Sequence, residues 1–138
     1  MPRLFGLYAL TAVVFFAIDL VWLGVVAASF YRRQMGDLMR PDPQWGAALG
    51  FYALYIAGIL VFAVLPGLEA DSLRRTVALG AFFGLVAYAT FDLTSLALVR
   101  DFPRTMVVVD LIWGTALTAS VSAAGWAIGR WLGIGVGS

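Results

Sequence analysis

The sequence contains no cysteine and no histidine, and it contains no lysine, because all nine basic residues are arginine. The first two absences exclude disulfides, zinc or haem ligation and nucleophilic catalysis through these side chains. The third excludes a Schiff base of the kind that retinal and pyridoxal phosphate need. We therefore expect no cofactor.

Charge is also scarce. Charged residues make up 12% of the 138 residues and apolar residues 62%, against about 25% and roughly 45–50% in soluble domains. A soluble domain of this size has a large surface to keep hydrated, and so few charges cannot cover it. The composition excludes a soluble enzyme, a nucleic-acid-binding protein and a disordered chain. It predicts an integral membrane protein whose partner is the lipid bilayer.

Long apolar runs are abundant. Four of them reach or nearly reach the ~20 residues that a helix needs to cross a bilayer, and none alternates as a barrel strand does. A helix also satisfies its own backbone hydrogen bonds in lipid. The sequence predicts one all-α transmembrane domain over residues 1–138, an antiparallel four-helix bundle with helices at 4–30, 47–65, 77–99 and 106–128. The first run is too long for a signal peptide and contains Asp19, so we expect it to be retained.

Three acidic residues lie inside these apolar runs: Asp19, Asp92 and Asp110. A charged aspartate at a helix centre costs about 3 kcal/mol on insertion scales. No arginine lies within the runs to neutralise them. Each carboxyl must therefore be protonated, hydrogen-bonded, bound to a cation or open to a wet cavity.

The three carboxyls have related depths. At 1.5 Å per residue, Asp19, Asp92 and Asp110 lie ~16, ~10 and ~6 Å from the membrane face that bears the connections 31–46 and 100–105. Tyrosines of the second helix reach a similar depth from that face. We expect these side chains to share one pocket, placed off-centre in the bilayer.

Donor side chains accompany the acids at helical spacing. Trp22 follows Asp19 by three residues and Trp113 follows Asp110 by three, so each pair shares a helix face. An indole N–H from one helix could hold the carboxylate of another. No residue is assigned a catalytic role, and no spacing motif specifies a metal. The candidate residues for binding a ligand or proton are Asp19, Asp92, Asp110, Trp22, Trp113, Tyr52, Tyr55, Tyr88, Thr94 and Ser95.

Small residues recur at the four-residue spacing that lets helix backbones approach closely. They include Gly80 and Gly84 in the third helix, and Ala116, Ser120 and Ala124 in the fourth. Such faces serve packing within a bundle or a homo-oligomer, and packing is the commoner use.

Four segments together resemble a known family. They are Asp19–Gly24, Phe51–Tyr55 with Gly58, Ala87–Thr94 and Val109–Gly114, of which Ala87–Thr94 is the most specific. The chain resembles domain-of-unknown-function family 2177 over nearly its whole length. The resemblance implies a four-helix bacterial membrane protein, located as a multi-pass protein in the inner membrane. It implies no role for any residue.

Three functional interpretations follow. In the first, the aspartates hydrogen-bond across helices and only fix packing, as in a structural or assembly subunit. In the second, they line a polar cavity that binds or carries a proton, a cation or a small polar ligand. In the third, they serve a membrane enzyme acting on a lipid or isoprenoid. We favour the second, because interhelical hydrogen bonds return only ~0.6 kcal/mol each, because intramembrane ionisable residues are usually functional, and because no acid-rich catalytic motif is present.

Overall fold

A computed structural model describes residues 2–22, 24, 30, 33–34 and 45–134. Helix α1 spans Pro2–Val21, α5 spans Leu73–Leu98 and α6 spans Arg104–Trp131. The remaining segment is continuous from Trp45 to Glu69 and consists of α3 (Trp45–Ile59), the π-helical turn η3 (Leu60–Val64) and α4 (Leu65–Glu69).

The four segments contain 20, 25, 26 and 28 residues, and each is long and apolar enough to cross a membrane. The prediction of an all-α, four-helix membrane bundle is confirmed. The last three helices begin two to four residues before their predicted starts. For α5 the reason is that Arg74 and Arg75 continue the helix to its cap at Ser72. The predicted first helix runs to residue 30, but α1 ends at Val21, and residues 25–29 lie outside the described part of the chain.

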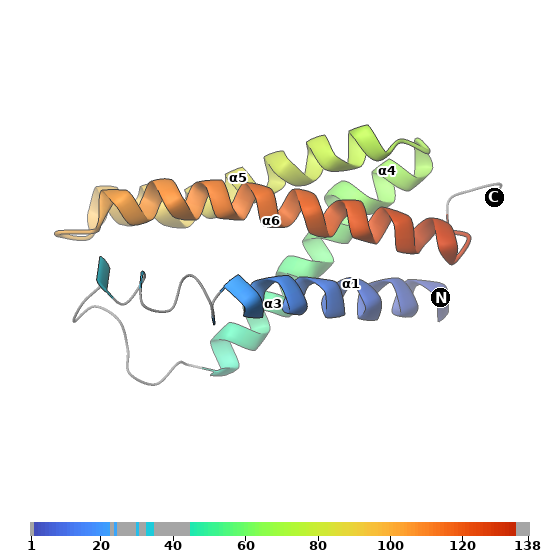
Figure 1. The fold of residues 1–138 in the computed structure, drawn as a ribbon, viewed down its shortest axis with the longest axis horizontal. Helices are drawn as coiled ribbons and strands as arrows, with labels where there is room; N and C mark the ends of the chain where they lie inside the picture. The colour runs from blue at the N-terminus through green and yellow to red at the C-terminus, as the bar shows by residue number, and fades with distance from the viewer. Residues whose placement is uncertain (1, 23, 25–29, 31–32, 35–44, 135–138) are drawn as a thin grey trace.

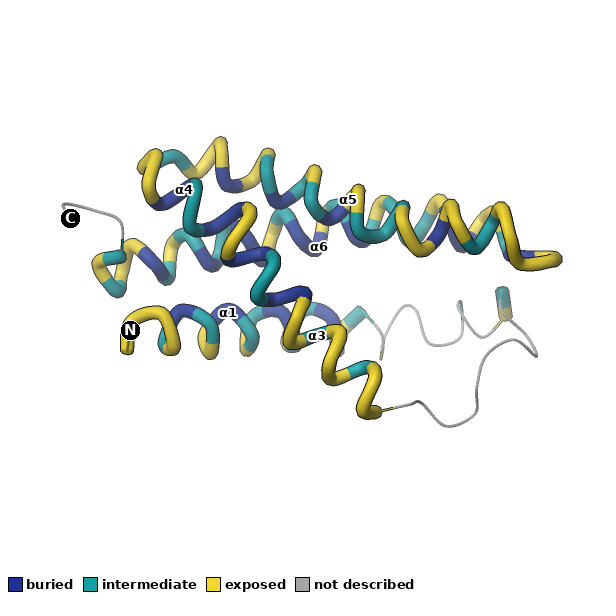
Figure 2. The backbone as a smooth tube through the Cα atoms, turned by 180° about the vertical axis from the view of Figure 1, so that it is seen from behind, coloured by how far each residue is buried: buried dark blue, intermediate teal, exposed yellow. Residues whose placement is uncertain are grey.

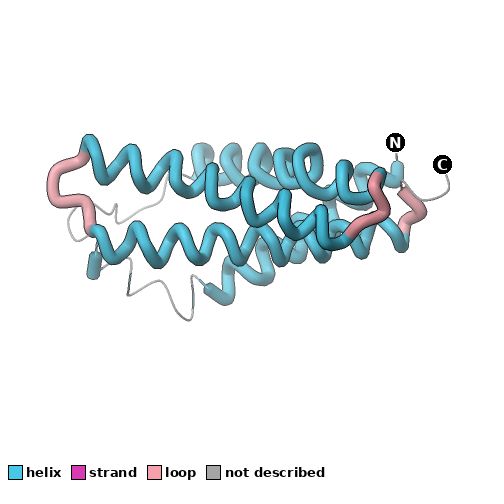
Figure 3. Tube along the Cα trace, turned by 90° about the horizontal axis from the view of Figure 1, so that it is seen from above, coloured by secondary structure: helices cyan, strands magenta, loops and turns pink. Residues whose placement is uncertain are grey.

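Helices α5 and α6 form the most closely packed pair, lying antiparallel over their whole length (Figures 1 and 3). Glycine permits this approach, since a Cβ atom added to Gly84 would collide with the carbonyl of Gly114 and the side chain of Thr118. Gly80 likewise lies against Ser122. The Gly80–Gly84 face thus packs inside the chain, whereas Ala116 and Ser120 are exposed on the outside of α6.

The second membrane segment crosses the bundle at an angle (Figures 1 and 2). Its middle, η3, contacts both α5 and α6, while the first half of α3 diverges from α5 and is largely exposed (Figure 2). Pro66 accounts for the widened turn: it lacks an N–H, and its ring would clash with the carbonyl four residues earlier. The helix therefore adopts π-type bonding just before it, with the Leu65 N–H donating to the carbonyl of Leu60.

Apolar side chains from all four segments meet in one core, which occupies the half of the bundle nearer the start of α1. The fully buried members include Leu7, Phe15, Ile59, Val64 and Val121. At that end the indole N–H of Trp126 donates to the carbonyl of Gly67 at 3.2 Å. A second, smaller apolar cluster of Phe102, Met106 and Val107 lies near the α5–α6 turn, and polar and aromatic groups lie between the two.

Candidate functional site

All four membrane segments line a small polar cavity in the half of the bundle away from the core. Its volume is about 140 Å³. The end of α1, the start of α3, the second half of α5 and the first half of α6 all contribute side chains to its wall. These residues are Asp19, Trp22, Phe51, Tyr52, Tyr88, Asp110 and Trp113.

Asp19 is held in this wall by two other segments. Its side chain is near the end of α1, and the residue is only 7% exposed. The hydroxyl of Tyr52, on α3, donates to Asp19 Oδ2 at 3.3 Å. The side chain of Trp113, on α6, also interacts with the Asp19 carboxyl. A carboxyl of α1 is thus oriented by one donor from α3 and a second group from α6.

Two indoles form the aromatic side of the cavity. Trp22 of α1 stacks on Trp113 of α6, with ring centroids 4.2 Å apart and planes inclined by 8°. The Nε1 of Trp22 is buried without a hydrogen-bond partner among the described residues. Their spacing from an aspartate predicts both tryptophans as residues of the site, and the structure places the two rings face to face.

The three aspartates form a chain rather than a cluster. Asp110 interacts electrostatically with Asp19 on one side and with Asp92 on the other. Asp92 is fully buried and does not line the cavity, and apart from its interaction with Asp110 its carboxyl oxygens have no hydrogen bond to a described residue. Within the described part of the chain, no group of three or more acidic side chains is arranged to hold a metal ion.

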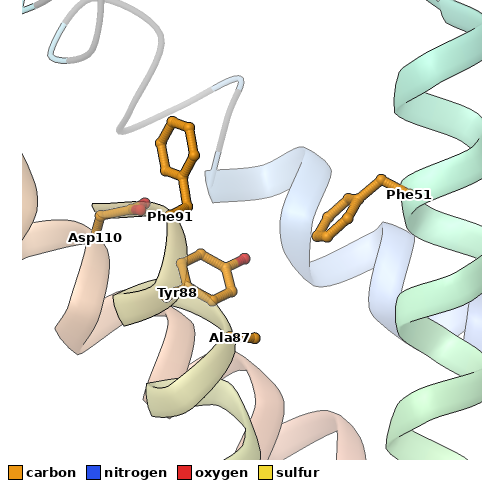
Figure 4. A pocket seen from close by; sticks show the side chains of 5 residues that line it. All are labelled: Phe51, Ala87, Tyr88, Phe91 and Asp110. Atoms are coloured by element: carbon orange, nitrogen blue, oxygen red, sulfur yellow. The ribbon is translucent and has the colours of Figure 1, made fainter. Parts of the chain in front are cut away.

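An apolar pocket of about 470 Å³ adjoins the polar cavity (Figure 4). It is lined by Phe51 of α3, by Ala87, Tyr88 and Phe91 of α5, and by Asp110 of α6. In Figure 4, the ring of Phe51 faces those of Tyr88 and Phe91 across the gap between α3 and α5. Three residues, namely Phe51, Tyr88 and Asp110, line both spaces.

Four of the predicted site residues lie elsewhere, and one of them is Asp92, so the three aspartates do not line one common pocket. Tyr55 is buried in the core, where its hydroxyl shares a hydrogen bond of 2.7 Å with Thr118 Oγ1. Thr94 is exposed on the outside of α5, and Ser95 is half-buried and lines neither space. Tyr55 follows Tyr52 by three residues, but the tilt of α3 directs the later residue toward the core.

Sequence reasoning missed the apolar lining. Phe51, Ala87 and Phe91 each adjoin a predicted polar residue along the chain. Ala87 and Phe91 are four residues apart, so they share one helix face. That spacing could have indicated a second face next to the polar one, but only the divergence of α3 makes it a pocket.

The fold and the site together define a class: a multi-pass membrane protein of four helices with acidic side chains buried within the membrane. The family model of predicted membrane proteins known as domain-of-unknown-function family 2177 matches residues 4–127. The chain belongs to this family. No curated protein and no solved structure matches it.

Proposed function

We propose that this protein binds a cation or a protonated small polar molecule in the cavity between Asp19 and Asp110, within the inner membrane of a bacterium. One observation supports this most directly: carboxyls from two different segments line one small cavity, and none of the described residues that line it with them is basic. Taking carboxylates out of water carries a large desolvation cost, and a cation bound between the two carboxyls would offset part of that cost.

The aromatic wall supports the same ligand. The faces of tryptophan and tyrosine attract cations, and aromatic cages are a recurrent means of binding ammonium groups. Trp22, Trp113, Tyr52 and Tyr88 place four such rings around the two carboxyls. This combination of acids and ring faces favours an ammonium-like ion over an anion.

An unpartnered group argues against a purely structural role. A network that only fixes helix packing gains its stability from satisfied hydrogen bonds. The Nε1 of Trp22, in the wall of the cavity, is buried without such a partner among the described residues. Groups of this kind cost stability, which is expected where a site serves a ligand.

Titration of the purified protein in dodecyl maltoside micelles with tetramethylammonium chloride tests the proposal. Trp22 and Trp113 lie in the wall, so their fluorescence reports occupancy, with sodium chloride at equal ionic strength as the reference. We expect saturable binding that Asp110→Asn weakens by about tenfold or more, the equivalent of losing one charge contact.

Asp101→Asn is the matched control. Asp101 lies in the α5–α6 turn with φ 59°, a conformation that asparagine also adopts readily. This variant should bind like the unmodified protein. Titrations of the unmodified protein and Asp110→Asn that coincide would contradict the proposal.

A further inference from the structure

The depth of the apolar pocket indicates the side from which a ligand would enter it. Phe51 is six residues into α3 and Phe91 is seven residues before the end of α5, so both lie roughly 10 Å inside the ends of their helices. That depth falls within a hydrocarbon core of ~30 Å. Phe51 and Phe91 are 49% and 58% exposed. The pocket therefore opens sideways into lipid, between α3 and α5.

Its composition matches a hydrocarbon chain. Apart from Asp110 and the hydroxyl of Tyr88, the lining is made of aromatic rings and Ala87. A volume of about 470 Å³ is within the ~300–1,000 Å³ that small-molecule sites occupy. Asp110 and Tyr88 then mark the end at which this pocket meets the polar cavity.

The polar cavity has the size of a substituted head group. Its 140 Å³ corresponds to roughly four or five water molecules at ~30 Å³ each. A bare metal ion would leave most of this space unfilled. A phosphate-bearing head group would meet two carboxyls and no basic side chain among the lining residues. The negative charge of the phosphate would therefore be repelled.

We propose that the ligand is a lipophilic cation taken directly from the bilayer. Its ammonium head lies between Asp19 and Asp110, and its hydrocarbon tail lies between Phe51 and Phe91. This inference rests on the proposed function, and adds to it the tail, the lateral entry between α3 and α5, and the exclusion of anionic head groups.

The test compares probes that separate head from tail, in dodecyl maltoside micelles with tryptophan fluorescence as the readout. Tetramethylammonium supplies the head alone, decyltrimethylammonium the head and tail, and decanol the tail alone. Ala87→Leu should fill the apolar pocket and weaken decyltrimethylammonium about tenfold, the effect of excluding a few buried methylenes. It should leave tetramethylammonium binding unchanged. Asp110→Asn should weaken both cations.

Ala78→Leu is the matched control, because it adds the same side chain at an exposed position on the same helix. Partition of the probe into micelles is the same for all variants, so it cancels in the comparison. If Ala87→Leu does not fold, Phe91→Ala removes a wall of the apolar pocket alone, because Phe91 does not line the polar cavity, and it should weaken only the tailed cation.

The outcomes separate the two proposals. If Ala87→Leu and Phe91→Ala leave decyltrimethylammonium binding unchanged while Asp110→Asn weakens both cations, the cation site stands and the lipophilic ligand is wrong. If decanol binds as tightly as decyltrimethylammonium, the cationic head is unnecessary and this inference is overturned. If Asp110→Asn affects neither cation, both proposals fail.

Discussion

Replacing Asp92 with alanine should stabilise the protein. Its carboxyl is fully buried in α5, and both oxygens lack a hydrogen-bond partner among the described residues. A buried, unsatisfied polar group costs ~1–3 kcal/mol. The neighbouring carboxyl of Asp110 interacts with it but supplies no positive charge. Alanine removes the group, fits the space and is the better helix former by a few tenths of a kcal/mol.

The expected gain is at the lower end of that range. In a micelle the unfolded helices also find partial partners for polar groups, which reduces interaction energies measured in membrane proteins. We therefore expect Asp92→Ala to raise the free energy of unfolding by ~1 kcal/mol. Asp92→Asn keeps the shape and a polar group, so it should gain less.

Unfolding by sodium dodecyl sulfate in mixed micelles, followed by circular dichroism, measures this quantity. Thr94→Ala is a suitable control, because Thr94 lies two residues further along α5 and faces outward, so its effect should be near zero. A loss of ~0.6 kcal/mol or more in Asp92→Ala would show that Asp92 stabilises packing. The structural interpretation of the aspartates would then be correct, and the reasoning above would be wrong.

Three further predictions concern individual contacts, of which the first two are measured by the same unfolding assay and the third by titration with tetramethylammonium. Gly84→Ala should destabilise the bundle by ~1–3 kcal/mol, because the added methyl has no room between α5 and α6. Gly50→Ala is the control, since its added methyl meets no atom within 4 Å and it should be neutral or stabilising. Equal effects of the two substitutions would contradict the close packing of α5 and α6. Ser72→Ala should cost ~1 kcal/mol, because Ser72 Oγ accepts a hydrogen bond of 3.0 Å from the backbone N–H of Arg75 at the start of α5; an unchanged midpoint would refute the cap. Tyr52→Phe should lower the affinity for tetramethylammonium a few-fold by releasing the Asp19 carboxyl, and an unaltered titration would mean that this hydrogen bond does not position it.

The fold was predictable because it follows from composition and run length. Lipid leaves a chain of this hydropathy few options other than helices, and four runs of sufficient length give four spans. Even the cap of α5 follows from local chemistry, since a serine before an apolar run is a typical helix start. The start of the second span at Trp45 rather than residue 47 is the usual uncertainty of helix ends.

The site was predictable only in part. Asp19, Asp92 and Asp110 could be placed at related depths from residue counts alone, and Trp22 and Trp113 followed from their spacing. The depths do not give the order of the carboxyls, in which Asp110 lies between the other two. That order depends on how helices rotate against one another, which no single-helix pattern contains.

The apolar pocket could not be predicted because it depends on a helix that does not pack. The close fit of α5 against α6 depends on glycines, and it fixes where Tyr88 and Asp110 meet. The second span joins this pair through η3, at the widened turn before Pro66, so its earlier half is free to diverge. Phe51 of α3 therefore stands apart from Tyr88 and Phe91 of α5, and the space between them is the apolar pocket. The tilt set near Pro66 thus shapes this pocket, although that proline lies far along the chain from the residues that line it.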